Sequence, residues 1–307
     1  MAAVAFSVFI MLLWQGPWWI DEGHFSTVTP GRAALVTGFR TSMVALGAGA
    51  VAGIGLFYTD RTLRQTRIRD REQARLAIEG QITDRYIKSV GLLASSDPTE
   101  QLGGIYALER IMRDSPKDHM PVTEVLASFV RRHAILTVED HIEEMASTGH
   151  RVADPVQAAM TVLSRRPVRN EPYPLTLRRV DLHGAILDDG NLRRFRLREA
   201  HLEHADLRRV HLEGAGLQGA YLQGAHLREG HLENADLSGA RLRGARLVDA
   251  RLHGTTLYGA DLTEAIGVTV EQILTARIDG TTSLPSEISC HPLVQELVET
   301  DRGHSPE

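Results

Sequence analysis

Histidines are the residues of this chain whose type and spacing most suggest chemistry. His201, His211, His226 and His231 each stand one residue before a leucine of a regular series. Imidazole nitrogens bind zinc and transfer protons near neutral pH. A metal centre also needs further convergent ligands and supporting hydrogen bonds, and the sequence shows no fixed carboxylate partner for these histidines. We therefore interpret them as a solvated series and predict no metal site.

A second group of candidate ligands lies in the middle of the chain. His141 and Glu144 have an i, i+3 spacing, which would place both on one side of a helix. A single pair of this kind is not a metal centre, so a solvated acidic face is the favoured interpretation. The whole group comprises Glu139, Asp140, His141, Glu143 and Glu144.

Other catalytic or cofactor-binding patterns are weak or missing. Residues 47–52, Gly-Ala-Gly-Ala-Val-Ala, fit the dinucleotide-binding pattern, but they lie inside an apolar run and not between a strand and a helix. No serine stands in a GxSxG context, and no phosphate-binding loop is present. The single cysteine, Cys290, excludes an internal disulfide and a multi-cysteine metal site. We predict that the protein is not an enzyme, with no catalytic, cofactor-binding or metal residues and no cofactor.

Two uncharged apolar runs near the N-terminus predict a pair of membrane-spanning helices. The first covers residues 1–20 and carries three tryptophans near its end, where aromatic rings favour the headgroup level. The second covers 41–58, and residues 21–40 form the predicted external loop between them. A signal peptide would need a basic N-terminal region, and no Lys or Arg precedes Arg32.

Arginines predict the orientation of this membrane hairpin. Six arginines stand between Arg61 and Arg75, whereas the loop carries only Arg32 and Arg40. An excess of basic residues marks the cytoplasmic side, so both termini are expected in the cytoplasm. The predicted protein is therefore a multi-pass protein of the cell membrane. The lipid bilayer is its first partner, with arginine contacts to anionic headgroups as a second use of the same residues.

The segment between the hairpin and the leucine series reads as helical. Residues 59–90 predict a polar juxtamembrane helix with apolar positions at four-residue spacing. Residues 91–169 predict a small helical domain, whose first helix begins at Asp97 and Pro98, a good cap and a good first residue. Further helices are expected to begin at Pro121 and to cover 138–147 and 155–165.

A leucine recurs every five residues from Leu177 to Leu262, at all 18 positions of the series. The residue two places before the leucine is alanine at 11 of these positions. A period of five fits neither an α-helix nor a simple strand. A chain that turns a corner every five residues satisfies the pattern, because the leucine and the small residue then both point inward.

This segment resembles the pentapeptide-repeat family, whose consensus is A(D/N)LXX. Ala205-Asp-Leu207, Ala235-Asp-Leu237 and Ala260-Asp-Leu262 match it. The resemblance implies a right-handed quadrilateral β-helix over residues 170–264, with four pentapeptides per coil and His211 stacked on His231. The 18 repeats would form about four and a half coils, a rod about 20 Å long at about 4.8 Å per coil.

The resemblance and the flanking segments complete the expected fold. Residues 265–307 predict a capping helix that begins with a capping box at Thr269 and Gln272, followed by a loosely held tail after Pro285. Residues 103–110 are similar to the linker of membrane-attached actinobacterial members. The predicted fold class is a mainly β solenoid plus α, preceded by the two-helix transmembrane hairpin and the small helical linker domain.

The resemblance implies a binding surface at the cytoplasmic membrane for an unidentified cytoplasmic protein partner. The alternative is DNA mimicry, in which soluble members bind and protect the type II topoisomerase gyrase. Mimicry needs a dense anionic surface, yet residues 171–264 hold 13 Arg and 14 Asp plus Glu, a net charge of −1. No direct nucleic-acid contact is expected. Some family members dimerise end to end, and a homodimer is left open here.

Overall fold

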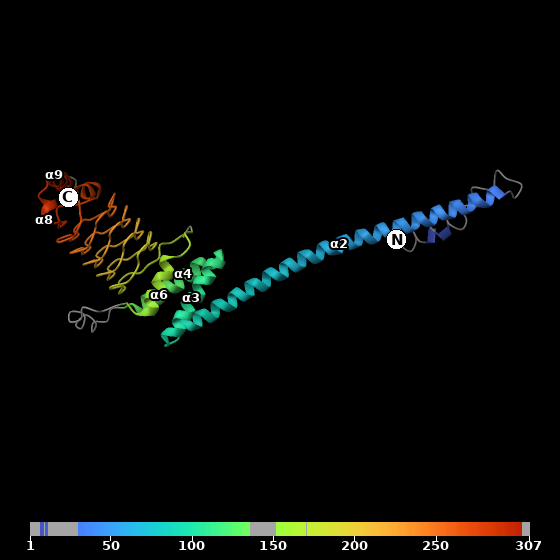
Figure 1. Cartoon of the computed structure of the whole chain (residues 1–307), viewed down its shortest axis with the longest axis horizontal. Coiled ribbons are helices and arrows are strands. Elements are labelled where there is room, and N and C mark those ends of the chain that lie inside the picture. The colour runs from blue at the N-terminus through green and yellow to red at the C-terminus, as the bar shows by residue number, and fades with distance from the viewer. Residues whose placement is uncertain (1–6, 9, 12–29, 136–151, 170, 303–307) are drawn as a thin grey trace. The chain divides into compact units, whose positions relative to one another are not determined.

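The computed structural model describes residues 7–8, 10–11, 30–135, 152–169 and 171–302 (Figure 1). The chain divides into two units, residues 1–80 and 81–307. Most of the first predicted membrane helix lies outside the described residues, as do the predicted helix at 138–147 and its acidic group.

Helix α2, Pro30–Leu93, is continuous over 64 residues. It begins inside the segment predicted as an external loop, residues 21–40, and continues through the predicted element boundaries at residues 58 and 90. Proline suits the first helical position because its missing N–H has no intrahelical partner there. The next proline in the chain is Pro98, so no strong helix breaker interrupts α2.

The apolar part of α2 is exposed around its circumference. Val44, Leu46, Val51, Ile54 and Leu56 are between 55% and 72% exposed. Among the described residues, this is the one helix whose length and composition would let it cross a bilayer, with a mean hydropathy of 1.6 over its most apolar 18 residues.

After the end of α2, the second unit continues with a group of short helices. They are α3 (Pro98–Asp114), the 3₁₀ turn η1 (Pro116–Asp118), α4 (His119–His133) and α6 (Asp154–Ser164). The predicted start of α3 is confirmed, because the Asp97 side chain accepts a hydrogen bond from Thr99 N at 2.8 Å. Helix α4 begins at His119, two residues before the predicted Pro121. Pro121 still lies in the first turn, where no backbone N–H is required.

The rest of the unit is a coiled solenoid. From Thr176 to Ile266, parallel β-bridges join each bridge residue to the one 20 residues later, which confirms four pentapeptides per coil. The bridges are isolated and no longer strand forms within the described solenoid, because the chain turns a corner in every pentapeptide. The bridges between the first two coils are Thr176–Arg196, Asp181–His201, Ile186–Asp206 and Asn191–His211.

The leucine series forms the core of the solenoid, as predicted. All 18 leucines are at most 2% exposed. Burying one such side chain contributes roughly 1.5–3 kcal/mol relative to leaving it exposed. Thr255 takes one of the small-residue positions, and its buried hydroxyl donates a hydrogen bond to Leu232 O at 2.7 Å.

The helices cover the N-terminal end of the solenoid. An uncovered first coil would expose four rows of unpaired backbone groups, which invite association with other chains. Each row is instead bonded by a group from the helical segment. The bonds are Arg131 Nη1 to Thr176 O (2.7 Å), Asp181 N to Ala134 O (2.8 Å), Gln157 Nε2 to Ile186 O (2.8 Å) and Asn191 N to Ser164 O (2.9 Å).

A short helix, α7 (Val270–Thr275), covers the C-terminal end and carries the predicted capping box. Gln272 Nε2 donates to Leu247 O and Ala250 O of the last full coil, at 3.0 and 2.8 Å. Gly267 stands five residues after the last leucine of the series; its φ is 78°, and a Cβ atom there would lie 2.3 Å from Val248 Cγ2. Only glycine fits this backbone and this space.

The described part of the segment after Pro285 is mostly helical, whereas the sequence predicted a loosely held tail. It forms α8 (Ser286–Ser289) and α9 (Pro292–Arg302). Ile288 and Val294 are buried against the solenoid end, at 9% and 1% exposed. The apolar residues of this short segment therefore add to the C-terminal cover.

Candidate functional site

Histidine and glutamate side chains form a column on one face of the solenoid. The rings of His211 and His231 stack with centroids 4.5 Å apart, as predicted. His211 Nδ1 lies 3.1 Å from Glu213 Oε1, and His231 Nδ1 lies 3.7 Å from Glu233 Oε1. Within each His-Leu-Glu triplet the leucine points inward, so the two polar side chains share the outer face. The glutamate two residues after each histidine of the column is the local signal from which this carboxylate partner could have been predicted.

The geometry of the column does not suit a metal ion. The ligand atoms of His211, Glu213 and His231 lie within 4.8 Å of one another. The two rings are only 29° from parallel, so their nitrogens point side by side and not towards one centre. Arg193 also donates to Glu213 Oε1 at 2.7 Å and lies 3.2 Å from His211 Nδ1, which places a positive charge where a cation would bind.

The remaining histidines of the series lie elsewhere. His201 is 8% exposed, stacks on Tyr221 with a centroid distance of 4.1 Å, and lies 3.0 Å from Glu203. His226 belongs to another face, between Asp206 and Arg246 in the bridge register. The solenoid therefore brings two of the four histidines together and keeps the others apart.

The Glu213 ion pair predicts a pH dependence of stability. Burial on its own raises the pKa of Glu213, but hydrogen bonds from Arg193, the backbone and His211 outweigh it and lower the pKa to about 2. Because the unfolded value is about 4.3, this stabilisation is present above that pH and is lost as the pH falls towards 2. Glu213→Gln is expected to lower the free energy of unfolding by about 1 kcal/mol at pH 6.

Denaturant titrations across pH 2–6 measure this difference. It should shrink steadily below about pH 4.3 as the wild-type carboxylate becomes protonated. Glu229→Gln, at a more exposed pair with Arg228, is the matched control and should differ little from wild type at any pH. A Glu213 difference that is constant over this range would contradict the assignment.

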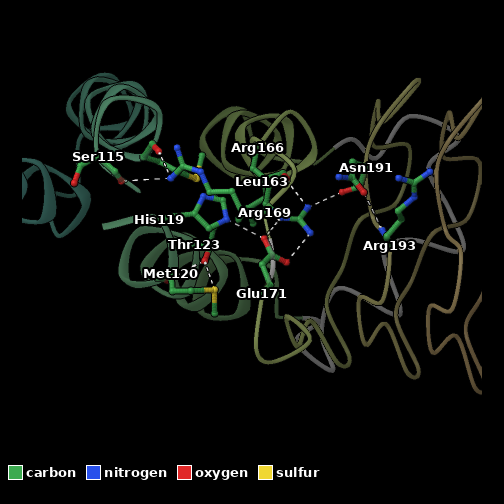
Figure 2. Close-up of polar contacts among 11 residues, drawn as sticks. Ser115, His119, Met120, Thr123, Leu163, Arg166, Arg169, Glu171, Asn191 and Arg193 are labelled. Carbon is green, nitrogen blue, oxygen red and sulfur yellow. Dashed lines mark hydrogen bonds and ion pairs between the residues drawn. The ribbon is translucent and has the colours of Figure 1, made fainter. Parts of the chain in front are cut away.

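A buried ion pair joins the helices to the first coil (Figure 2). Arg166 Nε and Nη2 donate to the two oxygens of Glu171 at 2.6 and 3.0 Å, and their side chains are 4% and 14% exposed. His119 Nε2 lies 3.0 Å from Glu171 Oε1. Arg166 Nη1 also donates to Leu163 O and Asn191 O, at 2.9 and 2.6 Å.

The contacts of this cluster suit a structural role. Burial raises the pKa of Glu171, but Arg166 and His119 outweigh that effect, so the pKa is lowered and the carboxyl stays ionised at neutral pH. An ionised carboxylate bound on both oxygens is a poor general acid. The guanidinium also lies over the Phe195 ring, 4.8 Å from its centroid. The cluster therefore holds the first coil to the helices.

The outer surface of the solenoid carries ion pairs of mixed sign. Arginines pair with carboxylates at several places on the described faces. These exposed pairs fix side-chain positions more than they stabilise the fold. Examples are Arg209–Asp189 (2.6 Å), Arg208–Asp206 (2.6 Å) and Arg243–Glu264 (2.7 Å).

Comparison with known proteins identifies the repeat. The family model "Pentapeptide repeats" matches in eight copies, over residues 177–214, 215–254 and 231–266. A solved pentapeptide repeat protein from Nostoc PCC 7120 is 32% identical, with 38% of this chain and 81% of that chain covered and a TM-score of 0.28. The chain belongs to the pentapeptide-repeat family.

Two further pentapeptide-repeat structures are similar. Rfr23 from Cyanothece 51142 is 33% identical, with 38% of this chain and 67% of that chain covered and a TM-score of 0.19. HetL from Nostoc sp. strain PCC 7120, involved in heterocyst differentiation regulation, is 35% identical, with 34% and 43% covered and a TM-score of 0.17. No curated protein matches the chain. Pentapeptide repeats imply a right-handed β-helical solenoid, and the bridge register gives the four pentapeptides per coil.

Proposed function

We propose that this pentapeptide-repeat protein is a membrane-anchored, non-enzymatic scaffold whose solenoid presents a surface to a cytoplasmic protein partner. The observation that carries the proposal is that each pentapeptide has two inward-facing and three outward-facing side chains. The leucine and the small residue fill the core, and the other three side chains face outward on a backbone that is hydrogen-bonded from coil to coil. Such a surface displays side chains at fixed spacing, as a binding module requires.

The composition of α2 supports the membrane anchor. Residues 41–58 carry no charged side chain, and their large apolar residues are exposed on all sides. A helix that is apolar all round is stable inside a protein core or in lipid. Because the described residues provide no protein cover for this part of α2, lipid is the environment that its surface favours.

The distribution of arginines supports the cytoplasmic placement of the solenoid. Arg61, Arg64 and Arg67 follow the apolar part of α2 directly, and three more arginines follow by residue 75. Basic residues next to a membrane span favour the cytoplasmic side. The solenoid lies on the same side of the span in sequence, so it would face the cytoplasm.

The charge pattern disfavours mimicry of DNA. A mimic presents closely spaced negative charges, but the carboxylates of this solenoid mostly pair with arginines of the same or a neighbouring coil. The near-zero net charge of residues 171–264 agrees with this pattern. A surface of mixed charge complements an ordinary protein surface better than it complements the positively charged DNA-binding site of a topoisomerase.

The experiment is a crosslinking pull-down from native membranes with the full chain and with a chain truncated before residue 170. Both should stay in the carbonate-washed membrane pellet, which tests the anchor independently of the partner. At least one protein should be captured by the full chain and lost with the truncation. A chain that washes off would refute the anchor, and identical captured sets would refute the solenoid as the binding surface.

A further inference from the structure

A groove of about 530 Å³ lies at a corner of the solenoid and is lined by residues of four successive coils, from Thr176 to Asp236. Its lining changes along the axis, with arginines at one end and amide side chains at the other. The polar lining residues are Thr176, Arg178, Arg194, Arg196, Arg198, Gln218, Asn234 and Asp236.

Most arginines of the solenoid have a carboxylate partner, but those of the groove mostly do not. Of the 13 arginines in residues 171–264, eight pair with a carboxylate. Arg178, Arg194 and Arg196 have no such partner within the described residues, and all three line the groove. The fourth, Arg198, shares Glu199 with Arg179. The groove therefore gathers three of the five arginines without a carboxylate partner in the described solenoid, and Asp236 is the one carboxylate in its lining.

Two glycines form the floor of the groove. The bridge register places Gly216 between Arg196 and Asp236 of the neighbouring coils. Gly214 precedes it at the corner, where a Cβ atom would come within 3.9 Å of Arg194 Cγ. The middle coil thus contributes no side chain at either position, so the arginines of one coil and the polar groups of the next flank open space.

The far end of the groove is chemically different. Gln218 donates to Asp236 at 2.7 Å, and Asn234 stands beside them. Amide side chains both donate and accept hydrogen bonds, as the backbone of a peptide does. A phosphate or another small anion would use only the arginine end, whereas a peptide would use both ends.

We propose that this groove binds an acidic segment of a partner polypeptide, with its carboxylates on Arg178, Arg194 and Arg196 and its backbone along Gln218 and Asn234. Guanidinium groups bind carboxylates through paired, charge-assisted hydrogen bonds, and arginine clusters recognise acidic motifs in this way. The inference rests on the proposed function, since it names the part of the solenoid that contacts the protein partner.

The test is fluorescence anisotropy of a labelled oligoglutamate peptide with the purified full chain in detergent. Binding is expected for wild type, should weaken with added salt, and should fall at least about tenfold for the triple variant Arg178→Gln, Arg194→Gln, Arg196→Gln. Arg246→Gln is the matched control, because Arg246 also lacks a carboxylate partner within the described residues but lies on another face. It should bind as wild type does.

A second variant tests the groove without altering charge. Gly216→Leu fills the floor while all four arginines stay, and equivalent positions in the column carry Thr176, Arg196, Asp236 and Thr256, so the backbone accepts a side chain there. The nearest contact of the new Cβ would be the flexible Gln218 amide at 3.1 Å. Oligoglutamate binding should again fall about tenfold.

Three results would overturn the proposal. These are equal binding of oligoglutamate to wild type and the triple variant, equal binding of a length-matched oligoglutamine peptide, and preference for a single-stranded oligonucleotide or inorganic phosphate in competition. The pull-down separates this failure from failure of the proposed function. If the triple variant still captures the solenoid-dependent protein, the scaffold stands and another face binds it.

Discussion

Replacing Glu171 with alanine is expected to lower the free energy of unfolding by about 3–5 kcal/mol, because it leaves a buried guanidinium without its counter-charge. Arg166 is 4% exposed and cannot reach solvent without opening the contact between α6 and the first coil. The lost carboxylate also removes the partner of His119. Urea unfolding of the full chain, followed by circular dichroism, measures the change.

Two further variants make the Glu171 result specific. Glu199→Ala removes a carboxylate from an exposed arginine pair and should cost less than about 1 kcal/mol. The double variant Arg166→Met, Glu171→Leu removes both charges and should recover most of the stability, since a buried pair contributes little more than an apolar pair of similar size. A Glu171→Ala protein within about 1 kcal/mol of wild type would show that Arg166 finds another partner.

Leu217→Ala is expected to destabilise the solenoid by about 2–5 kcal/mol. Leu217 is 0% exposed in the middle of the core, with Leu197 and Leu237 at the same position of the adjacent coils. The truncated side chain leaves a cavity that the closely stacked coils can close only by distorting their bridges. The effect should appear as a lower unfolding midpoint in denaturant, with the β-helical spectrum retained in buffer.

Ile266→Ala is the control for this cavity. Ile266 belongs to the same solenoid and forms a bridge with Arg246, but its side chain is 53% exposed. Its truncation should cost less than about 1 kcal/mol. Comparable losses for Leu217→Ala and Ile266→Ala would mean that the coils relax around the lost leucine, contrary to a closely packed core.

The five-residue period in the sequence is enough to predict the solenoid before any contact between coils is known. A leucine at every fifth position and a small residue two places earlier leave one way to bury both, which is a corner in each pentapeptide. The buried leucines and the 20-residue bridge register follow from that pattern and the family resemblance. The Asp97 cap of α3 and the capping box of α7 were also predictable from the sequence, because a helix cap depends only on residues close to it in the chain.

Boundaries without a local signal were less predictable. The continuity of α2 past residue 58 depends on the absence of a strong breaker, which a hydropathy pattern does not measure. The order of the segment after Pro285 depends on Ile288 and Val294 finding the solenoid end. A few apolar residues in a polar segment do not reveal in advance what surface they will cover.

Tertiary structure alone decided which polar groups meet. His119 and Glu171 are 52 residues apart, and only the packing of α4 against the start of the solenoid joins them. The glycine floor and the arginines of the groove come from different coils, so their grouping follows from the 20-residue stacking together with which arginines find carboxylates. The sequence by itself determined the repeat and its buried face, because burial of leucine obeys a local period. The partners of outward side chains depend on the coils above and below, and these become neighbours only in the folded solenoid.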